Sequence, residues 1–237
     1  MKVALIGYGA MGKFIEQRLL EKGHTVAGIV SLDQLKDINE VKDDFDVMID
    51  FSNPANLSML LDYATKNKKP LVIATTGFSE DQIKSIYDAS KLAPIVYTAN
   101  FSLGVTVFEE VLKMVTPILK DTFDIEVIEK HHNKKIDAPS GTAKMLVSAM
   151  NQDGEFEEVF GREGVAKRGK EIGVHAVRGG TIVGEHSVIF AGEDEVLEIK
   201  HEAHSKNIFA NGAIKAAEFL VGQEPGVYTM NDVLFSK

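Results

Sequence analysis

The stretch GYGAMG at residues 7–12 decides the fold, because it is a G-x-G-x-x-G turn placed directly after the short apolar run Val3–Ile6. The residues behind it have helical spacing, so the turn joins a strand to a helix. In this context the first glycine permits a tight turn, the second lets the backbone approach a pyrophosphate, and the third allows the helix to pack against the strand. The stretch therefore predicts a dinucleotide-binding turn, in which the helix N-terminus offers N–H groups to phosphate.

Further apolar runs alternate with helical segments over the first hundred residues. They are Val26–Val30, Val47–Phe51, Leu71–Thr75 and Ile95–Tyr97. Ser79 and Gln82 have the spacing of a capping box at the start of one of these helices. Strands that alternate with helices form a parallel sheet, so we expect an α/β fold of the Rossmann type.

The pattern changes after residue 102. A long helical stretch, Leu103–Lys120, comes before an alternating strand, Phe123–Glu129, and a second helix that begins at Ser140. The apolar runs between residues 175 and 200 have no helices between them, which indicates an antiparallel or mixed sheet. The segment Asn207–Leu220 again has helical spacing and could pack back on the first domain.

These patterns predict two domains. Residues 1–101 and 207–237 would form the dinucleotide-binding domain, with its parallel Rossmann-type sheet. Residues 102–206 would form an α+β domain with a mixed sheet.

Composition narrows the class of partner. The chain has 237 residues, a formal net charge of -9 and no cysteine. An acidic chain without a basic stripe is poorly suited to nucleic acid. It has no run of eighteen apolar residues and no charged-then-apolar leader. We therefore expect a soluble, cytoplasmic protein without disulfides, which acts on a small molecule and not on nucleic acid or a membrane.

The end of the second strand bears on the choice of cofactor. A carboxylate there favours NAD by accepting from the ribose 2'-hydroxyl, whereas small polar or basic residues favour the phosphate of NADP. Ser31 holds this position, Asp33 follows two residues later, and Lys36 and Lys13 could also reach a phosphate. We expect NADPH to be slightly preferred, with NADH also accepted.

Three other strand ends carry small polar residues, at 50–52, 74–77 and 99–102. An open parallel sheet places its ligand crevice beside the carboxyl ends of its strands, so the nicotinamide ring is expected here. The alternative is that Thr75, Thr76 and Ser102 only cap helices and form turns.

The stretch EKHHNKKIDAPSGTA at residues 129–143 has the densest concentration of reactive side chains. Adjacent histidines on an extended strand point to opposite faces, and no third ligand is evident, so we expect no metal site.

The backbone N–H groups of Gly141 and Thr142, at a helix start beside Lys135, would form a carboxylate pocket. His132 or Lys134 could meet a second carboxylate, which suits a small dianion. The alternative is a solvated charged face.

This stretch resembles the signature of the dihydrodipicolinate reductase family: a Glu, a His-His pair, a Lys three residues after the second His, and then Asp-Ala-Pro-Ser-Gly-Thr-Ala. The resemblance extends in order through ATTGF at 74–78, NFSLGV at 100–105, VGEH at 183–186 and FANGA at 209–213, so it spans nearly the whole chain. It implies an NAD(P)H-dependent oxidoreductase of the diaminopimelate and lysine pathway, which reduces a dicarboxylate. It also implies that residues 102–206 form the substrate-binding and oligomerisation domain, and that the chain assembles as a homotetramer through the sheets of this domain.

The resemblance also implies roles for individual residues. His131 would be the general acid that protonates the substrate, and Lys135 would stabilise the charge that develops. The substrate carboxylates would be bound by His132, Lys135, Gly141 and Thr142. The residues expected at the cofactor are Gly7, Tyr8, Gly9, Ala10, Met11, Gly12, Lys13, Ser31, Phe51, Ser52, Ala74, Thr75, Thr76, Thr98, Ala99, Asn100 and Phe101.

Two other functions are compatible with the glycine turn. Another two-domain dehydrogenase of the aspartate pathway would share it, although such an enzyme would not require the His-His-x-x-Lys stretch. A nucleotide sensor that signals through a partner would also keep the turn, because fold alone does not establish activity.

Overall fold

The computed structural model describes residues 1–236. Contacts divide the chain into two compact units. Unit 1 comprises Met1–Leu103 together with the chain from Asn207 onward, and unit 2 comprises Gly104–Lys206. The chain thus passes from one unit to the other twice.

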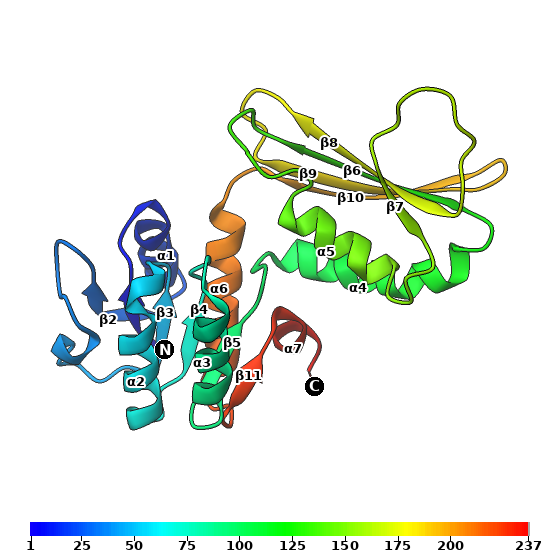
Figure 1. Ribbon diagram of the computed structural model, residues 1–237. Coiled ribbons are helices and arrows are strands. Elements are labelled where there is room, and N and C mark those ends of the chain that lie inside the picture. The colour runs from blue at the N-terminus through cyan, green and yellow to red at the C-terminus, as the bar shows by residue number, and fades with distance from the viewer. Residues whose placement is uncertain (237) are drawn as a thin grey trace. The chain divides into compact units, whose positions relative to one another are not determined.

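Unit 1 is built on a six-stranded parallel sheet in the order β11-β5-β4-β3-β1-β2 (Figure 1). The strands are β1 (Lys2–Ile6), β2 (Thr25–Val30), β3 (Val47–Asp50), β4 (Leu71–Ile73), β5 (Pro94–Tyr97) and β11 (Gly226–Tyr228). The helices are α1 (Ala10–Glu21), α2 (Leu57–Asn67), α3 (Glu80–Ser90), α6 (Asn207–Leu220) and α7 (Met230–Phe235), with short 3-10 turns η1 (Ile38–Glu40) and η2 (Pro54–Asn56). The expected Rossmann-type sheet is confirmed.

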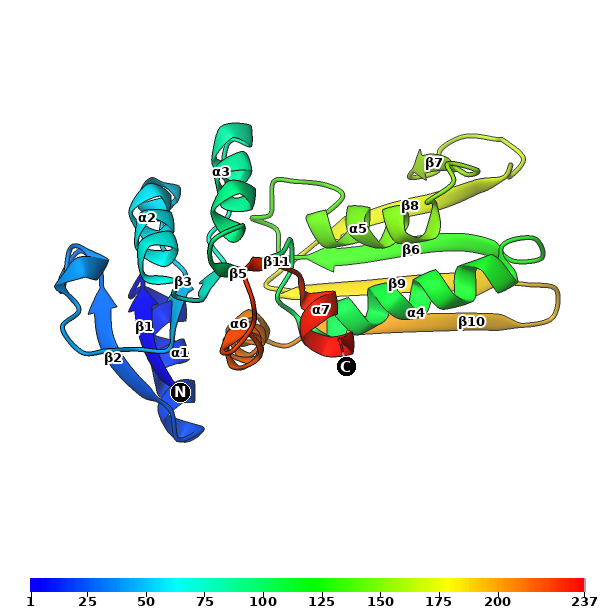
Figure 2. The same cartoon turned by 90° about the horizontal axis from the view of Figure 1, so that it is seen from below.

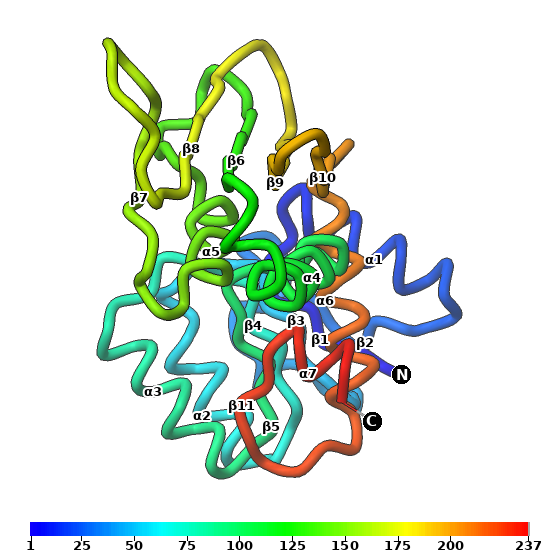
Figure 3. Tube along the Cα trace, turned by 90° about the vertical axis from the view of Figure 1, so that its right-hand side faces the viewer, coloured from blue at the N-terminus to red at the C-terminus, as the bar shows by residue number. Residues whose placement is uncertain are grey.

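Both faces of this sheet are buried. In β1, Val3 and Leu5 belong to one apolar core together with residues of α1, α6 and α7, whereas Ala4 and Ile6 belong to the other together with residues of α2 and α3. Successive strand residues point to opposite faces, so a strand covered on both sides reads as one continuous apolar run. Helix α6 lies beside α1 and against β3, β4 and β5, which completes the first of these cores (Figure 3).

Unit 2 has a five-stranded mixed sheet in the order β10-β9-β6-β8-β7. The strands are β6 (Asp124–His131), β7 (Glu157–Phe160), β8 (Glu171–Arg178), β9 (Gly184–Ala191) and β10 (Val196–Ala203), and the helices are α4 (Leu103–Leu119) and α5 (Gly141–Met150). Strands β7, β8 and β6 are mutually parallel, whereas β9 pairs antiparallel with β6 and β10. The mixed sheet expected from the sequence is confirmed.

Helices α4 and α5 cover one face of the unit 2 sheet (Figure 2). Their core with the strands includes Phe108, Leu146, Val127, Val188 and Phe190. Within residues 1–236, no helix is both long and apolar enough to cross a membrane.

Besides the 3-10 turn η1, two strands and one helix of the described residues were not expected from the sequence. Strands β7 and β11 are short strands at sheet edges, and helix α7 has only six residues. Strand β7 reads EEVF and is mostly exposed, so it has no alternating pattern that would identify it. Its pairing with β8 is set by tertiary contact.

Candidate active site

The glycine turn of unit 1 is packed tightly on its inner side. Gly7 has φ +91°, and a β-carbon built on it would lie 2.2 Å from the carbonyl oxygen of Phe51. A β-carbon on Gly12 would lie 2.2 Å from the carbonyl oxygen of Gly7. Only glycine fits at either position, because neither backbone contact can yield cheaply, and at Gly7 the positive φ is also one that L side chains rarely adopt.

The outer side of the turn is open. A β-carbon on Gly9 would meet nothing within 4 Å, and no side chain caps the N-terminus of α1. The first turn of α1 carries no acidic residue, and the Lys13 ammonium lies 5.8 Å from the centroid of the Tyr8 ring. Uncapped N–H groups, open space above Gly9 and a nearby cation suit the pyrophosphate of a dinucleotide.

The other residues expected at the cofactor lie at the carboxyl ends of the parallel strands. The backbone N–H of Ser52 donates to Thr75 Oγ1 at 2.9 Å, which joins the ends of β3 and β4. The rings of Phe51 and Phe101 are 6.5 Å apart between centroids. The backbone N–H of Ser102 donates to Asn100 Oδ1 at 2.8 Å, which shapes the turn after β5. Thus residues from three segments are brought to one edge of the sheet.

Asp50 is the buried carboxyl at the end of β3; it lies in the strand end 50–52 that the sequence singled out, but it was not among the residues expected at the cofactor. Burial raises its pKa to about 6, against hydrogen bonds from Ser52 and Thr75 that lower it. The Ser52 hydroxyl donates to Asp50 Oδ1 at 2.5 Å, and the Ser52 N–H lies 3.1 Å from the same oxygen. Asp50 therefore holds Ser52 in place at the edge where the nicotinamide is expected.

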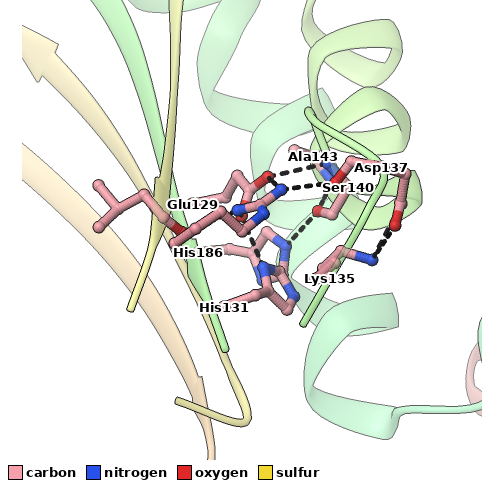
Figure 4. Close-up of polar contacts among 9 residues, drawn as sticks. Glu129, His131, Lys135, Asp137, Ser140, Ala143 and His186 are labelled. Carbon is pink, nitrogen blue, oxygen red and sulfur yellow. Dashed lines mark hydrogen bonds and ion pairs between the residues drawn. The ribbon is translucent and has the colours of Figure 1, made fainter. Parts of the chain in front are cut away.

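In unit 2 the central feature is the end of β6, where Glu129 and His131 lie on the same face of the strand (Figure 4). The His131 Nδ1 is 2.6 Å from Glu129 Oε2. The Glu129 side chain is fully buried, and His131 is 12% exposed. Residues two apart on a strand share a face, so the proximity of Glu129 and His131 could have been predicted from their spacing in the sequence.

Arg178 at the end of β8 is the partner that sequence reasoning missed. Its Nη2 donates to Glu129 Oε1 at 2.6 Å and its Nη1 donates to Glu129 Oε2 at 2.7 Å, a two-point ion pair. Burial raises the pKa of the Glu129 carboxyl, but the hydrogen bonds from Arg178 and His131 outweigh it, so the pKa is lowered overall. Glu129 is therefore ionised at neutral pH.

Ser140 connects this carboxylate to the start of α5. Its backbone N–H donates to Glu129 Oε1 at 2.9 Å, and its Oγ accepts from the Ala143 N–H at 3.1 Å as the N-cap of the helix. The same Oγ is 2.9 Å from Nε2 of His186. Burial first, and then the proximity of His131, lowers the pKa of His186 to about 4. His186 is thus neutral, and its Nε2 shares a hydrogen bond with the Ser140 hydroxyl.

The expected substrate-binding residues surround this helix start. Lys135 Nζ lies 2.7 and 2.9 Å from the two carboxylate oxygens of Asp137. Gly141 is the first residue of α5, Thr142 follows it, and a β-carbon on Gly141 would meet nothing within 4 Å. His132, next to His131, is half-buried. These positions place an ammonium group and helix N–H groups in one unit with the imidazole of His131.

No metal centre was expected here. Among residues 1–236, no three histidine, cysteine, aspartate or glutamate side chains are arranged to hold a metal ion. The expectation stays a prediction.

Comparison with known proteins gives the family context. Residues 1–101 match the family model described as dihydrodipicolinate reductase, N-terminus, and residues 104–234 match the model for the C-terminus of the same family. The chain is 46% identical over 252 residues to the 4-hydroxy-tetrahydrodipicolinate reductase of Clostridium novyi (strain NT), which covers 100% of this chain and 99% of the relative. It is 45% identical to the enzyme of the same name from Brachyspira hyodysenteriae (strain ATCC 49526 / WA1), over 99% of this chain and 100% of the relative.

A solved structure has the same fold. The dipicolinate-bound dihydrodipicolinate reductase from Paenisporosarcina sp. TG-14 superimposes with a TM-score of 0.79 over 99% of both chains, at 19% sequence identity.

Proposed function

The chain belongs to the dihydrodipicolinate reductase family, and from that premise we propose that it reduces 4-hydroxy-tetrahydrodipicolinate to tetrahydrodipicolinate with NAD(P)H, in diaminopimelate and lysine biosynthesis. The observation that carries the proposal is the full-length identity to reductases of this name, together with the imidazole of His131 beside a helix N-terminus and an ammonium group in unit 2. Two relatives matched over their whole length favour this reading over another dehydrogenase or a sensor.

The dicarboxylate would be held at the start of α5. We assign its carboxylates to the N–H groups of Gly141 and Thr142, to Lys135 and to His132, because a helix N-terminus and a cation together favour an anion. To bind a carboxylate, the Lys135 ammonium would exchange its pairing with Asp137 for one with the substrate. Lys135 would then also stabilise negative charge that develops on the ring.

His131 is assigned as the general acid. Its Nδ1 is occupied by Glu129, so Nε2 is the nitrogen available to the substrate. Histidine suits the role because its ordinary pKa lies nearest to neutrality. When bound, the nicotinamide would supply hydride from its C4 position and His131 a proton, and the 4-hydroxyl group of the substrate leaves as water, so that the reaction to tetrahydrodipicolinate balances.

We assign the cofactor to the open side of the glycine turn in unit 1. Gly9 leaves space for the pyrophosphate, the uncapped N-terminus of α1 donates to it, and Lys13 adds positive charge. Ser52, Thr75 and the turn at 98–101 would line the nicotinamide end. This arrangement fits a dinucleotide and supports no choice between NADH and NADPH by itself.

NADPH is the preferred cofactor in this proposal. Ser31 stands at the end of β2, and the Lys36 ammonium lies 3.5 Å from its carbonyl oxygen, so a cation rather than a carboxylate is close to the expected ribose position. Comparison of kcat/KM for the two cofactors tests this. Ser31→Asp should move the ratio towards NADH by about tenfold, equivalent to roughly one charged hydrogen bond. An unchanged ratio would contradict the placement of the ribose beside Ser31.

A homotetramer is part of the proposal. Helices α4 and α5 cover one face of the unit 2 sheet, and no helix of this unit covers the face that bears Ile128, Val177 and Ile189. Apolar side chains on an uncovered sheet face favour burial against a partner, here further copies of the chain. Sedimentation equilibrium should give four times the chain mass, and Val177→Asp should lower it.

The cytoplasmic location stays a prediction that fractionation of cells would test.

The decisive experiment follows the absorbance of reduced nicotinamide while the substrate is generated in place by its synthase from pyruvate and aspartate semialdehyde. Rapid oxidation that His131→Gln reduces by at least about a hundredfold, with unchanged cofactor affinity, supports the assignment. No oxidation with either cofactor, despite tight nucleotide binding, would favour a sensor or another dehydrogenase.

A further inference from the structure

The Glu129 carboxylate has every acceptor position filled. Oε1 accepts from Arg178 Nη2 at 2.6 Å and from the Ser140 N–H at 2.9 Å. Oε2 accepts from Arg178 Nη1 at 2.7 Å and faces His131 Nδ1 at 2.6 Å. A carboxylate offers about four lone-pair positions and, when ionised, no donor. Since burial raises the pKa of this carboxyl but its hydrogen bonds lower it further, the group is ionised and each partner must donate.

This fixes the proton on the His131 ring. If Glu129 only accepts, His131 Nδ1 carries a hydrogen in both the neutral and the charged ring. The neutral ring then has its lone pair on Nε2, and the charged ring presents an Nε2–H. A β-carbon on Gly184 would lie 3.1 Å from this Nε2, so a glycine here leaves that edge of the ring uncrowded.

We infer that Glu129 is a positioning residue for the proposed reaction, that it holds the His131 proton on Nδ1 and stabilises the charged ring, and that Arg178 acts through Glu129. This rests on the proposed function, because it presupposes His131 as the acid. Nothing in the resemblance assigned either residue a role.

Arg178 has no terminal N–H group left for a substrate. Besides its two bonds to Glu129, Nη1 donates to the Val177 carbonyl at 2.8 Å and Nη2 donates to the Asp137 carbonyl at 2.6 Å. All four terminal hydrogens are therefore used. The bond to Asp137 also ties the segment that bears Lys135 to the same carboxylate. A lysine cannot reproduce this planar fork, so Arg178→Lys removes the geometry and keeps the charge.

Strand β6 carries a matched control on its other face. Glu126 Oε2 is 2.7 Å from His175 Nε2, and Glu126 Oε1 accepts from Arg162 Nη2 at 2.6 Å. Glu126 thus has the same kinds of partner as Glu129, but it lies on the face of β6 opposite to His131. Glu126→Gln removes an equivalent ion-pair network from the same strand.

The test compares Glu129→Gln, Glu126→Gln and His131→Gln in the intact protein by measuring kcat and KM from about pH 6 to pH 9. A general acid works only when protonated, so activity falls as pH rises. Without the carboxylate the charged ring loses its anionic partner, so the fall should begin at a lower pH in Glu129→Gln. Its kcat at neutral pH should be about 10- to 100-fold lower, with cofactor affinity unchanged. The Glu126→Gln profile should match the wild type.

Arg178 is tested by a double-mutant cycle. Arg178→Lys should lower kcat several-fold in the wild-type background and by less than about twofold in the Glu129→Gln background, because its effect passes through the carboxylate. Equal effects in the two backgrounds would show that Arg178 acts independently and would overturn that part of the inference.

A measurement without turnover keeps the inference testable if the variants are unstable. In protein labelled with 15N-histidine, NMR of the ring nitrogens should show the His131 proton on Nδ1 in the neutral form, with His131→Gln used for assignment. A proton on Nε2 would overturn the inference. Glu129→Asp, which keeps the charge, should retain more of the wild-type pH profile than Glu129→Gln.

The outcomes for this inference and for the proposed function differ. If His131→Gln remains fully active, the assignment of the general acid fails. If His131→Gln is inactive but Glu129→Gln has the wild-type pH profile, only the positioning role fails.

Discussion

A β-carbon on Gly7 would lie 2.2 Å from the carbonyl oxygen of Phe51, so the glycine turn after β1 and the end of β3 are in direct backbone contact. Phe51 is followed by Ser52, which Asp50 and Thr75 hold by hydrogen bonds. The turn expected at the pyrophosphate and the strand end expected at the nicotinamide are therefore one rigid structure.

Alanine at Gly7 and alanine at Gly9 should have different effects. Gly7→Ala forces positive φ on an L residue and a clash with Phe51, so it should lower the free energy of unfolding by at least about 2 kcal/mol. Gly9→Ala meets nothing within 4 Å, so it should fold normally but bind NADPH more weakly, because its methyl group occupies the space left for the pyrophosphate. Urea unfolding and cofactor titration separate the two, and equal cofactor affinity in Gly9→Ala and wild type would contradict the placement.

The buried Asp50 should make stability fall as the pH rises. Its folded pKa is about 6, against about 3.9 in an unfolded chain, so the folded state holds the proton more tightly. The stability that this provides is full below about pH 4 and is lost between about pH 4 and 6. Asp50→Asn should remove this dependence on pH. The free energy of unfolding of the variant should therefore rise by roughly 2 to 3 kcal/mol relative to that of the wild type between pH 4 and 7. Denaturant titrations at these two pH values test this, and a constant difference would refute it.

The buried His186 should make stability fall as the pH is lowered, the opposite of the effect of Asp50. Its pKa is about 4 in the folded state and about 6.5 in an unfolded chain, so the folded state excludes the proton. The stability from the neutral ring is full above about pH 6.5 and is lost as the pH falls towards 4. The free energy of unfolding of His186→Gln, whose amide group can still hydrogen-bond to the Ser140 hydroxyl, should fall by roughly 3 kcal/mol less than that of the wild type between pH 7 and 4. Equal acid sensitivity of the two proteins would rule out a buried neutral His186.

Asp137 should compete with the substrate for Lys135. The pair has distances of 2.7 and 2.9 Å, but half of the Asp137 side chain is exposed, so the pair is worth less than about 1 kcal/mol. Asp137→Asn should therefore lower KM for the dicarboxylate by up to about fivefold and leave kcat little changed. A higher KM would instead mean that Asp137 holds Lys135 in its working position.

The sequence predicted the fold well because each strong signal was local. The glycine turn, the apolar runs of a sheet covered on both faces and the Ser79–Gln82 capping box depend on residues close together in the chain, and the structure contains all three. The short edge strands β7 and β11 could not be predicted, because their pairing comes from distant neighbours.

The hydrogen-bond network around His131 could likewise be predicted from the sequence only in part. Glu129 and His131 are two residues apart on a strand, so their shared face could be read from the sequence. Arg178 lies 49 residues from Glu129, and the register of β6 with β8 that brings them together is a tertiary feature. Strand alternation also places Lys130 on the other face, where it pairs with Glu185 at 3.1 Å. The basic run is thus divided between the two faces of the sheet.

The discontinuity of unit 1 has a consequence for synthesis on the ribosome. When residue 206 has been made, the sequence of unit 2 is complete, but the face of the unit 1 sheet that α6 will cover still exposes Val3, Leu5, Ile49 and Val72. Translation proceeds at about 5 to 20 residues per second, so this apolar face waits roughly 5 to 20 seconds, while Gly104–Lys206 is made, before Ala213, Ile214 and Ala217 are synthesised. The nascent chain is therefore most exposed to chaperones and to aggregation at its last step, when the helix that closes the nucleotide-binding unit is still in the exit tunnel.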